Sequence, residues 1–346
     1  VYGGWDYRMY VSGDESEKVT AYERYRQQSW SSTAQAEALL STPTFVHHGV
    51  KDNLVDVKNS RFLISELQRW GYPVRYAEYP DGDHFNDMGH WPKLMNWFSG
   101  HQLVRHPREV RVRSFLLKDA SAHWVNVQQV AHYLKPIHAW ARLITQNTIK
   151  LETENVASIR LSPGGPDIDM GQPLKVVWNG NLFTQPLVDG RVTLEARDYD
   201  PVPPVKRPGL AGPIGLARET PFAIVEGTRS TNEMMRILCK RLADQITSEW
   251  EESQKVTPRR FTDVELDAEA RSAYSLLLIG DSGVNSVTRQ LGESFPLVVE
   301  PDRVVIDGRK VEAKDAAVQM VYPSPWNEDR YVVVMAATSG KGMYHH

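Results

Sequence analysis

The hydrophobic pattern of this chain changes its period twice between the first residue and the last. Up to about residue 103, short apolar runs alternate with segments whose apolar side chains recur at helical spacing. From residue 104 to 198, apolar and polar residues alternate with period two, and from residue 199 onward the mixed pattern returns. We therefore predict an α/β region at 1–103, an antiparallel β-sandwich-like module at 104–198, and an accessory α/β region at 199–346.

The first region carries two strand candidates separated by one helix. The predicted elements, in chain order, are a strand at Thr44–His48, a helix over 57–70, a strand at Val74–Tyr79 and a helix from about Trp91 to Phe98. Pro43 and Gly49 bound the first strand, and Gly71 ends the first helix. This order of strands and helices predicts a parallel sheet with helices on its faces.

Turn signals and prolines divide the rest of the chain. Asn179-Gly180 predicts a tight hairpin between strands at Leu174–Val177 and Leu182–Thr184. The proline-rich residues 199–208 predict a stiff linker or an extended arm. Beyond it we expect strands at Phe222–Val225, Ser275–Ile279 and Tyr331–Met335, with a helix around 231–253.

Composition excludes several function classes. The shares of hydrophobic residues (41%) and charged residues (24%) are those of an ordinary soluble globular protein. A formal net charge of −3 supplies no positive field for nucleic acid, so no nucleic-acid partner is predicted. No apolar run reaches the ~18–20 residues needed to span a bilayer. Cys239 is the only cysteine and therefore cannot form an intrachain disulfide.

Two residues that can work together in catalysis follow the two strands of the first region. Asp52 comes after the turn at Gly49, and His84 lies in the loop after Val74–Tyr79. Because one helix connects the strands, we expect them to be neighbours, with both residues at the carboxyl edge of the sheet. An aspartate that accepts the ring N–H of a histidine fixes its tautomer, and the other ring nitrogen can then take a proton from a serine.

The segments around these residues resemble the catalytic domain of the prolyl oligopeptidase family and its esterase-like relatives. The matching pieces are His48-Gly49-Val50-Lys51-Asp52, Val55, Gly71-Tyr72-Pro73-Val74 and Gly82-Asp83-His84, preceded by the approach segment Trp30–Leu40. The resemblance covers roughly residues 1–100. It implies a serine hydrolase acting on a peptide or an ester, with 1–103 as the C-terminal part of its catalytic domain, and it favours a periplasmic or secreted location. The remaining two thirds contain the turn Ile279-Gly280-Asp281 and the stretch from Tyr322-Pro323-Ser324-Pro325-Trp326 to Tyr331-Val332-Val333-Val334. On these pieces they resemble a region appended to some bacterial hydrolases.

The sequence departs from this family at the nucleophile. No Gly-x-Ser-x-Gly occurs in the 346 residues, and Val1-Tyr2-Gly3-Gly4 resembles the end of the strand that follows the nucleophile helix. We therefore expect the serine in a missing N-terminal part upstream of residue 1, which makes this chain alone incomplete and inactive. Trp5 and Tyr7, just past that strand, are candidates for lining the substrate pocket.

Simpler interpretations stand beside this one. Asp52 and His84 can be ordinary turn residues, and the whole chain can be a non-catalytic binding or assembly module. Gly280-Asp281-Ser282-Gly283 echoes the nucleophile turns of some serine hydrolases, which suggests an esterase centred on Ser282. A structural alternative is that Asp281 or Ser282 caps the next helix.

Metal and cofactor signals are weak throughout. The acidic and histidine cluster Asp81, Asp83, His84, Asp87 and His90 matches no standard metal-binding loop. His47 and His48 are adjacent in a strand, so their side chains point to opposite faces and do not readily share an ion. Gly227-Thr228-Arg229-Ser230 at a strand-to-helix turn could hold an anion, but it lacks the glycine spacing and the lysine of a phosphate loop. We predict neither a metal nor a cofactor.

Overall fold

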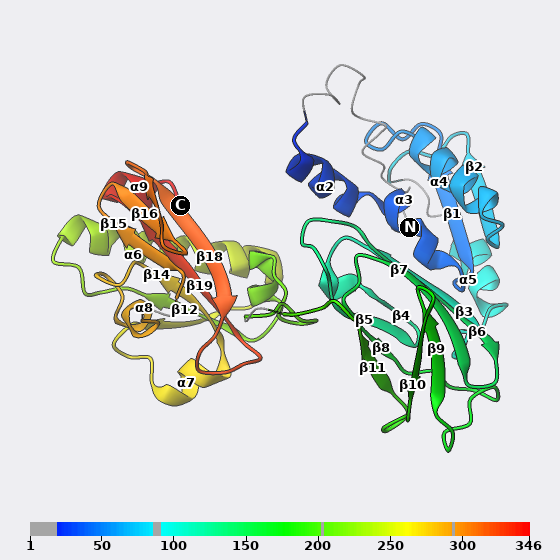
Figure 1. Cartoon of the computed structure of the whole chain (residues 1–346). Helices are drawn as coiled ribbons and strands as arrows, with labels where there is room; N and C mark the ends of the chain where they lie inside the picture. Colours follow the sequence, from blue (N-terminus) through cyan, green and yellow to red (C-terminus); the bar gives the residue numbers. More distant parts are fainter. Residues whose placement is uncertain (1–18, 86–90, 202–203, 293–294) are drawn as a thin grey trace. The chain divides into compact units, whose positions relative to one another are not determined.

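The computed structural model describes residues 19–85, 91–201, 204–292 and 295–346 (Figure 1). Within these ranges the protein is a mixed α/β structure with several sheets, including antiparallel strand modules. The chain divides into two compact units, Val1–Pro208 and Gly209–His346, with the boundary at the end of the proline-rich segment.

A parallel pair of strands organises the first part of the first unit. β1 (Thr44–Gly49) and β2 (Val74–Tyr79) pair in parallel, with Gly49 opposite Tyr79, and α4 (Lys58–Arg69) connects them. The apolar side chains of α4 lie on one face and pack under the strands, with Leu63, Ile64 and Leu67 buried beside Val46. The predicted strand, helix and strand are therefore present, and among the described residues this sheet has two strands.

Short helices flank this pair. They are α2 (Ala21–Trp30), α3 (Ser32–Gln35), the 3-10 turn η2 (Ala36–Leu39) and α5 (Trp91–Ser99). Thr20 begins α2 with a capping box, in which its hydroxyl accepts from the Glu23 backbone and the Glu23 carboxylate accepts from Thr20. The ring of Trp97 on α5 packs edge-on against Phe45 of β1 at 5.5 Å between ring centroids.

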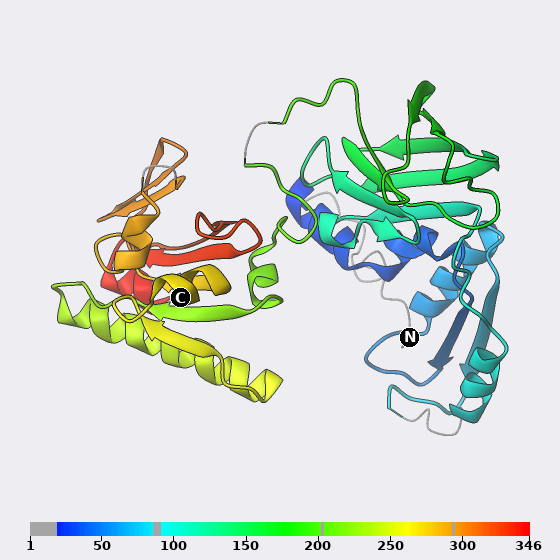
Figure 2. The same ribbon diagram turned by 90° about the horizontal axis from the view of Figure 1, so that it is seen from below.

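Residues 109–195 form the β module, in two sheets that lie in neighbouring layers (Figures 1 and 2). Its elements are β3 (Glu109–Ser114), the turn η4 (Leu117–Asp119), β4 (Ser121–Ala122), β5 (Val125–Gln129), β6 (Ile137–Thr145), β7 (Thr148–Glu154), β8 (Ser158–Leu161), β9 (Leu174–Trp178), β10 (Asn181–Gln185) and β11 (Val192–Glu195). The sheet orders are β10-β9-β7-β6-β3 and β11-β8-β5-β4. Alternate residues of β3, β6 and β7 are buried, as the period-two pattern predicts.

Pairing in this module is antiparallel apart from β7 with β9. The alternation of side chains is the same for both kinds of pairing, so the sequence pattern did not reveal this parallel pair. The hairpin at Asn179-Gly180 is present, and both residues have positive φ (45° and 84°), as a tight two-residue turn requires.

Glu37 links the α/β part of the first unit to the β module. Its carboxylate lies 3.1 Å from the Arg111 guanidinium of β3 and 3.2 Å from Nε2 of His138 on β6. The Tyr72 hydroxyl donates to the Glu37 carbonyl at 2.9 Å, and Ser41 Oγ donates to the Glu109 carbonyl at 3.2 Å. These contacts, together with η2 packing on β3, join the two parts within one compact unit.

The second unit is built on a five-stranded sheet in the order β13-β12-β14-β19-β18. Its elements are η5 (Ile214–Arg218), β12 (Phe222–Glu226), α6 (Glu233–Gln254), β13 (Arg259–Thr262), α7 (Ala268–Ala273), β14 (Ser275–Ile279), α8 (Ser286–Gln290), β18 (Ala317–Pro323), β19 (Tyr331–Ala337) and α9 (Gly340–Tyr344). A three-stranded sheet of β15 (Leu297–Glu300), β16 (Arg303–Ile306) and β17 (Arg309–Glu312) adjoins it.

Both faces of the larger sheet are covered. Every residue of β14 and β19 is buried, which explains why these strands are continuous apolar runs in the sequence. One core includes α6, with Leu238, Leu242 and Ile246, and the other includes residues of α8, β15 and β16. In the part of the chain that the structure describes, no helix is long and apolar enough to cross a membrane.

Candidate functional site

The turns that follow β1 and β2 are joined by backbone hydrogen bonds. The Val50 N–H donates to the Tyr79 carbonyl and the Lys51 N–H to the Gly82 carbonyl, both at 2.9 Å. An ion pair between Lys51 Nζ and Asp81 at 2.7 Å lies across the same two turns. The parallel pairing of the strands thus extends into the turns, which brings Asp52 and the loop that contains His84 to the same edge.

Asp52 and His84 are in direct contact. Oδ2 of Asp52 lies 2.9 Å from Nδ1 of His84, within hydrogen-bonding distance. Oδ1 of Asp52 accepts the backbone N–H groups of Leu54 (2.9 Å) and Val55 (2.8 Å), which fixes the orientation of the carboxylate. The Asp52 side chain is 5% exposed and that of His84 is 24% exposed, so the carboxylate is buried and the imidazole is partly accessible. The predicted contact is therefore present.

Hydrogen bonds keep the Asp52 carboxylate charged despite its burial. Burial alone would raise the pKa of Asp52, but the Val55 N–H, the His84 ring and the Leu54 N–H together hold this pKa below its ordinary value. A carboxylate that stays ionised beside an imidazole stabilises the imidazolium that forms when the ring takes up a proton.

A second histidine, which sequence reasoning did not identify as part of the site, also contacts Asp52. The buried Nε2 of His48 lies 3.2 Å from Asp52 Oδ2 and 2.8 Å from the Val55 carbonyl oxygen. Its Nδ1 lies 2.6 Å from the hydroxyl of Ser60 on α4. The one sequence signal for this placement is the alternation in β1, which puts His48 on the same buried face as Val46.

A charged cluster lies next to His48 on β2. Glu78, which pairs with His48 across the strands, accepts two hydrogen bonds from Arg61 and one from the Tyr76 hydroxyl, each at 2.7 Å. The Arg61 and Tyr76 hydrogen bonds lower the pKa of Glu78 to about 2. Arg61 therefore neutralises the carboxylate that lies opposite His48 on β2.

The histidines of β1 and the acidic loop after β2 were considered above as metal ligands. His47 contacts the rings of Phe45 and Tyr79, on the face opposite His48, as the strand alternation predicts. Asp87 and His90 lie outside the described residues. Among the residues that are described, no group of three or more His, Cys, Asp or Glu side chains could hold a metal ion.

The other candidate residues have different outcomes. Trp5 and Tyr7 lie outside the described residues.

Ser282 lies after β14, where its carbonyl accepts from the Arg289 side chain at 2.8 Å. The helix that follows is capped by Asn285, which accepts from Val287 and Thr288, so the expectation that Asp281 or Ser282 caps it is wrong. Within 209–292 and 295–346, no histidine is hydrogen-bonded to Ser282; His346 contacts other groups.

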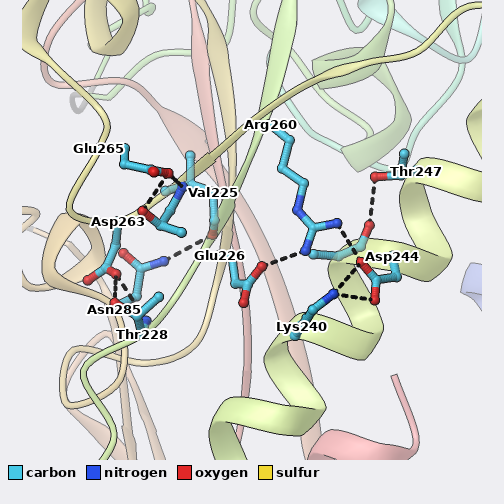
Figure 3. A network of polar contacts seen from close by, with 12 residues as sticks. Val225, Glu226, Thr228, Lys240, Asp244, Thr247, Arg260, Asp263, Glu265 and Asn285 are labelled. Atoms are coloured by element: carbon cyan, nitrogen blue, oxygen red, sulfur yellow. Dashed lines mark hydrogen bonds and ion pairs between the residues drawn. The ribbon is translucent and has the colours of Figure 1, made fainter.

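Polar residues at the carboxyl edge of the second sheet form a closed network (Figure 3). Asp263 follows β13, its side chain is fully buried, and its Oδ1 accepts the Thr228 N–H (3.0 Å) and hydroxyl (2.6 Å). Its Oδ2 accepts the Ser286 N–H at 2.6 Å. Asn285 donates to the carbonyls of Val225 and Ile279, both at 3.1 Å, and so joins the ends of β12 and β14.

This network occupies the donors of the turn at 227–230. The N–H groups of Gly227, Thr228 and Arg229 donate to Ile279, Asp263 and Val284 respectively. The Asp263 carboxylate lies where an external anion would bind at this turn. Such an anion would have to displace the partners of these N–H groups. On the other side of β12, Arg260 bridges Glu226 and Asp244, and Lys240 pairs with Asp244.

We compared the chain with protein-family models, with curated proteins and with solved structures. None of the three comparisons finds a match. What can be said of the site therefore depends on the residues of this chain and their geometry.

Proposed function

We propose that this chain is part of a serine hydrolase, a peptidase or an esterase, and that it supplies the acid and the base of a catalytic triad. The contact between Asp52 Oδ2 and His84 Nδ1 carries this proposal. A buried, ionised acid that orients an accessible imidazole is the arrangement that activates a serine hydroxyl.

In this function, each residue has a defined task. Nε2 of His84 takes the proton of the serine hydroxyl as the serine attacks the substrate carbonyl, and then gives it to the leaving group. Asp52 holds the ring in the Nδ1–H tautomer and stabilises the imidazolium between the two steps. Water repeats the sequence on the acyl-enzyme.

In this proposal the nucleophile comes from outside these 346 residues, because no Gly-x-Ser-x-Gly occurs in them. We propose that a strand, elbow and helix bearing the serine belong to a larger hydrolase sheet of which β1 and β2 are the C-terminal part. The oxyanion-hole donors would come with that segment, since one of them is the N–H that follows the nucleophile.

One observation favours a second candidate, a binding or assembly module without catalysis. The second unit has its own cores, and its main polar network is internally satisfied rather than open to a reactant. In this alternative, Asp52 and His84 only join two turns of the first unit.

Turnover by the complete protein separates the candidates. We expect His84→Ala to lower hydrolysis of a p-nitrophenyl ester by about 10³-fold or more, because the general base is lost. His101→Ala is the matched control, since this exposed ring contacts the Trp97 carbonyl at the end of α5, and it should leave turnover unchanged. Undiminished hydrolysis by folded His84→Ala would refute the assignment. Failure of a fluorophosphonate to label any serine of the complete protein would favour the binding module.

A further inference from the structure

We propose that His48 is a positioning residue of this site: it lies beside the Asp52 oxygen that bonds His84, and so tunes how strongly Asp52 holds the tautomer and the proton of His84. The importance of this residue for catalysis rests on the proposed function. The coupling between the two histidines, however, is a property of the first unit and can be measured without turnover.

The contacts of His48 define its protonation. Nε2 faces two acceptors, the Val55 carbonyl at 2.8 Å and Asp52 Oδ2 at 3.2 Å, so this nitrogen must carry a hydrogen. Nδ1 lies 2.6 Å from Ser60 Oγ, whose hydroxyl can donate to it. His48 is therefore a neutral ring in the Nε2–H tautomer, held in that tautomer by Ser60 as a hydrogen-bonded partner holds a catalytic or metal-bound histidine.

The Asp52 carboxylate accepts three N–H groups and has a fourth polar neighbour. Leu54 and Val55 donate to Oδ1 and the His84 ring bonds to Oδ2, while Nε2 of His48 lies 3.2 Å from the same Oδ2. Each additional donor draws negative charge away from the others. The polar His48 N–H beside Oδ2 thus leaves Asp52 a weaker acceptor toward the His84 ring.

The remaining ionisable groups around His48 keep a constant charge near neutral pH. Glu78 from β2 is paired with Arg61 from α4 and bonded by Tyr76, and the pKa of Glu78 is lowered to about 2. Hydrogen bonding also holds the pKa of Asp52 below its ordinary value. These groups therefore add no charge change of their own to the His84 spectra near neutral pH.

Nuclear magnetic resonance of the ¹⁵N-histidine-labelled chain tests this role. The tautomer and the titration midpoint of His84 are followed in His48→Phe, which keeps a ring without a donor, and in Ser60→Ala, which removes the partner that fixes the His48 tautomer. We expect the proton affinity of His84 to rise about three- to tenfold in His48→Phe, and in the same direction in Ser60→Ala, with a larger share of the Nδ1–H tautomer.

Two further variants supply the controls. His48→Gln restores an N–H donor near the position of Nε2 and should return the His84 titration toward that of the parent chain. His47→Phe changes the neighbouring ring on the opposite face of β1 and should leave the titration unchanged. If His48→Phe does not fold, Ser60→Ala and His48→Gln decide the outcome.

An unchanged midpoint and tautomer in folded Ser60→Ala and His48→Phe would overturn the proposal. Its failure can be told apart from failure of the proposed function, because the spectra need neither the nucleophile nor a substrate. A shifted His84 titration in a protein that hydrolyses nothing would support the coupling and count against the hydrolase. An unshifted His84 titration in an active hydrolase would overturn the coupling and support the hydrolase.

Discussion

A Cβ atom added to Gly49 would lie 2.4 Å from the carbonyl oxygen of Gly82 and 2.8 Å from that of Asp83. The first distance is well inside van der Waals contact, and the obstructing atoms belong to the backbone. The turn that carries Asp52 and the turn that carries His84 therefore touch directly. Glycine at position 49 is the residue that allows this approach.

Replacing Gly49 with alanine should separate the two turns. We expect Gly49→Ala to cost about 1–3 kcal/mol of stability in the first unit and to weaken the contact between Asp52 and His84. Hydrogen exchange of the β1 and β2 amides would report the loss. Gly100→Ala is the control, because its Cβ would meet the Trp97 carbonyl at an ordinary 3.5 Å. Equal protection in the two variants would show that the loop can move aside without cost.

Glu37 should make the junction between the α/β part and the β module sensitive to acid. The His138 hydrogen bond, opposed by burial and assisted by Arg111, lowers the pKa of Glu37. Because the folded-state pKa is depressed, this stabilisation is present above the ordinary value of about 4.5 and is lost as the pH falls through the folded-state value.

We therefore expect Glu37→Gln to destabilise the first unit by about 1 kcal/mol at pH 6, with a smaller effect toward pH 3. Hydrogen exchange of the β3 and β6 amides at the two pH values measures this difference. Glu154→Gln, an exposed carboxylate at the end of β7, should show no such trend. A deficit for Glu37→Gln that is constant with pH would contradict the assignment.

Asp263 should be essential for the stability of the second unit. Asp263→Ala would leave the Thr228 and Ser286 donors without their acceptor, at a cost of about 3–5 kcal/mol. Asp263→Asn keeps one acceptor oxygen and should cost less. Urea unfolding, followed by the hydrogen exchange of β12 and β14, measures the loss, and Glu252→Ala on the exposed side of α6 is the control. A cost for Asp263→Ala equal to that of the control would refute this role.

Cys239 should be inert in the folded protein. Burial, with a smaller contribution from Glu226 and Asp281, raises the pKa of the Cys239 thiol to about 12, and thiolate is the reactive form. We expect no reaction with a thiol reagent at pH 8 until denaturant is added, when one thiol per chain should react. Ser282→Cys, at an exposed position, provides the positive control. Rapid labelling of Cys239 in native protein would contradict its burial.

The contact between Asp52 and His84 could be predicted because it depends on chain order alone. Two neighbouring parallel strands end at one edge, so residues in the turns just after them meet there. The contact of His48 with Asp52 could not be predicted from chain order. It depends on how α4 presents Ser60 to the strand, which is a matter of packing rather than of periodicity.

The same distinction explains the other differences. The buried strands β12, β14 and β19 were visible as apolar runs, whereas β17 has four exposed residues and no apolar face, so it carried no strand signal. The helix cap after β14 was assigned to the wrong residue because Asp281, Ser282 and Asn285 are all suitable cap residues. The backbone geometry of the turn selects Asn285.

The division of the chain at Pro208 and Gly209 has a genetic consequence. Each unit carries its own sheets and buries its own side chains, so a substitution that unfolds one need not unfold the other. Alleles damaged in 209–346 can accordingly keep the contact between Asp52 and His84, and their phenotype would then reveal the task of that half alone.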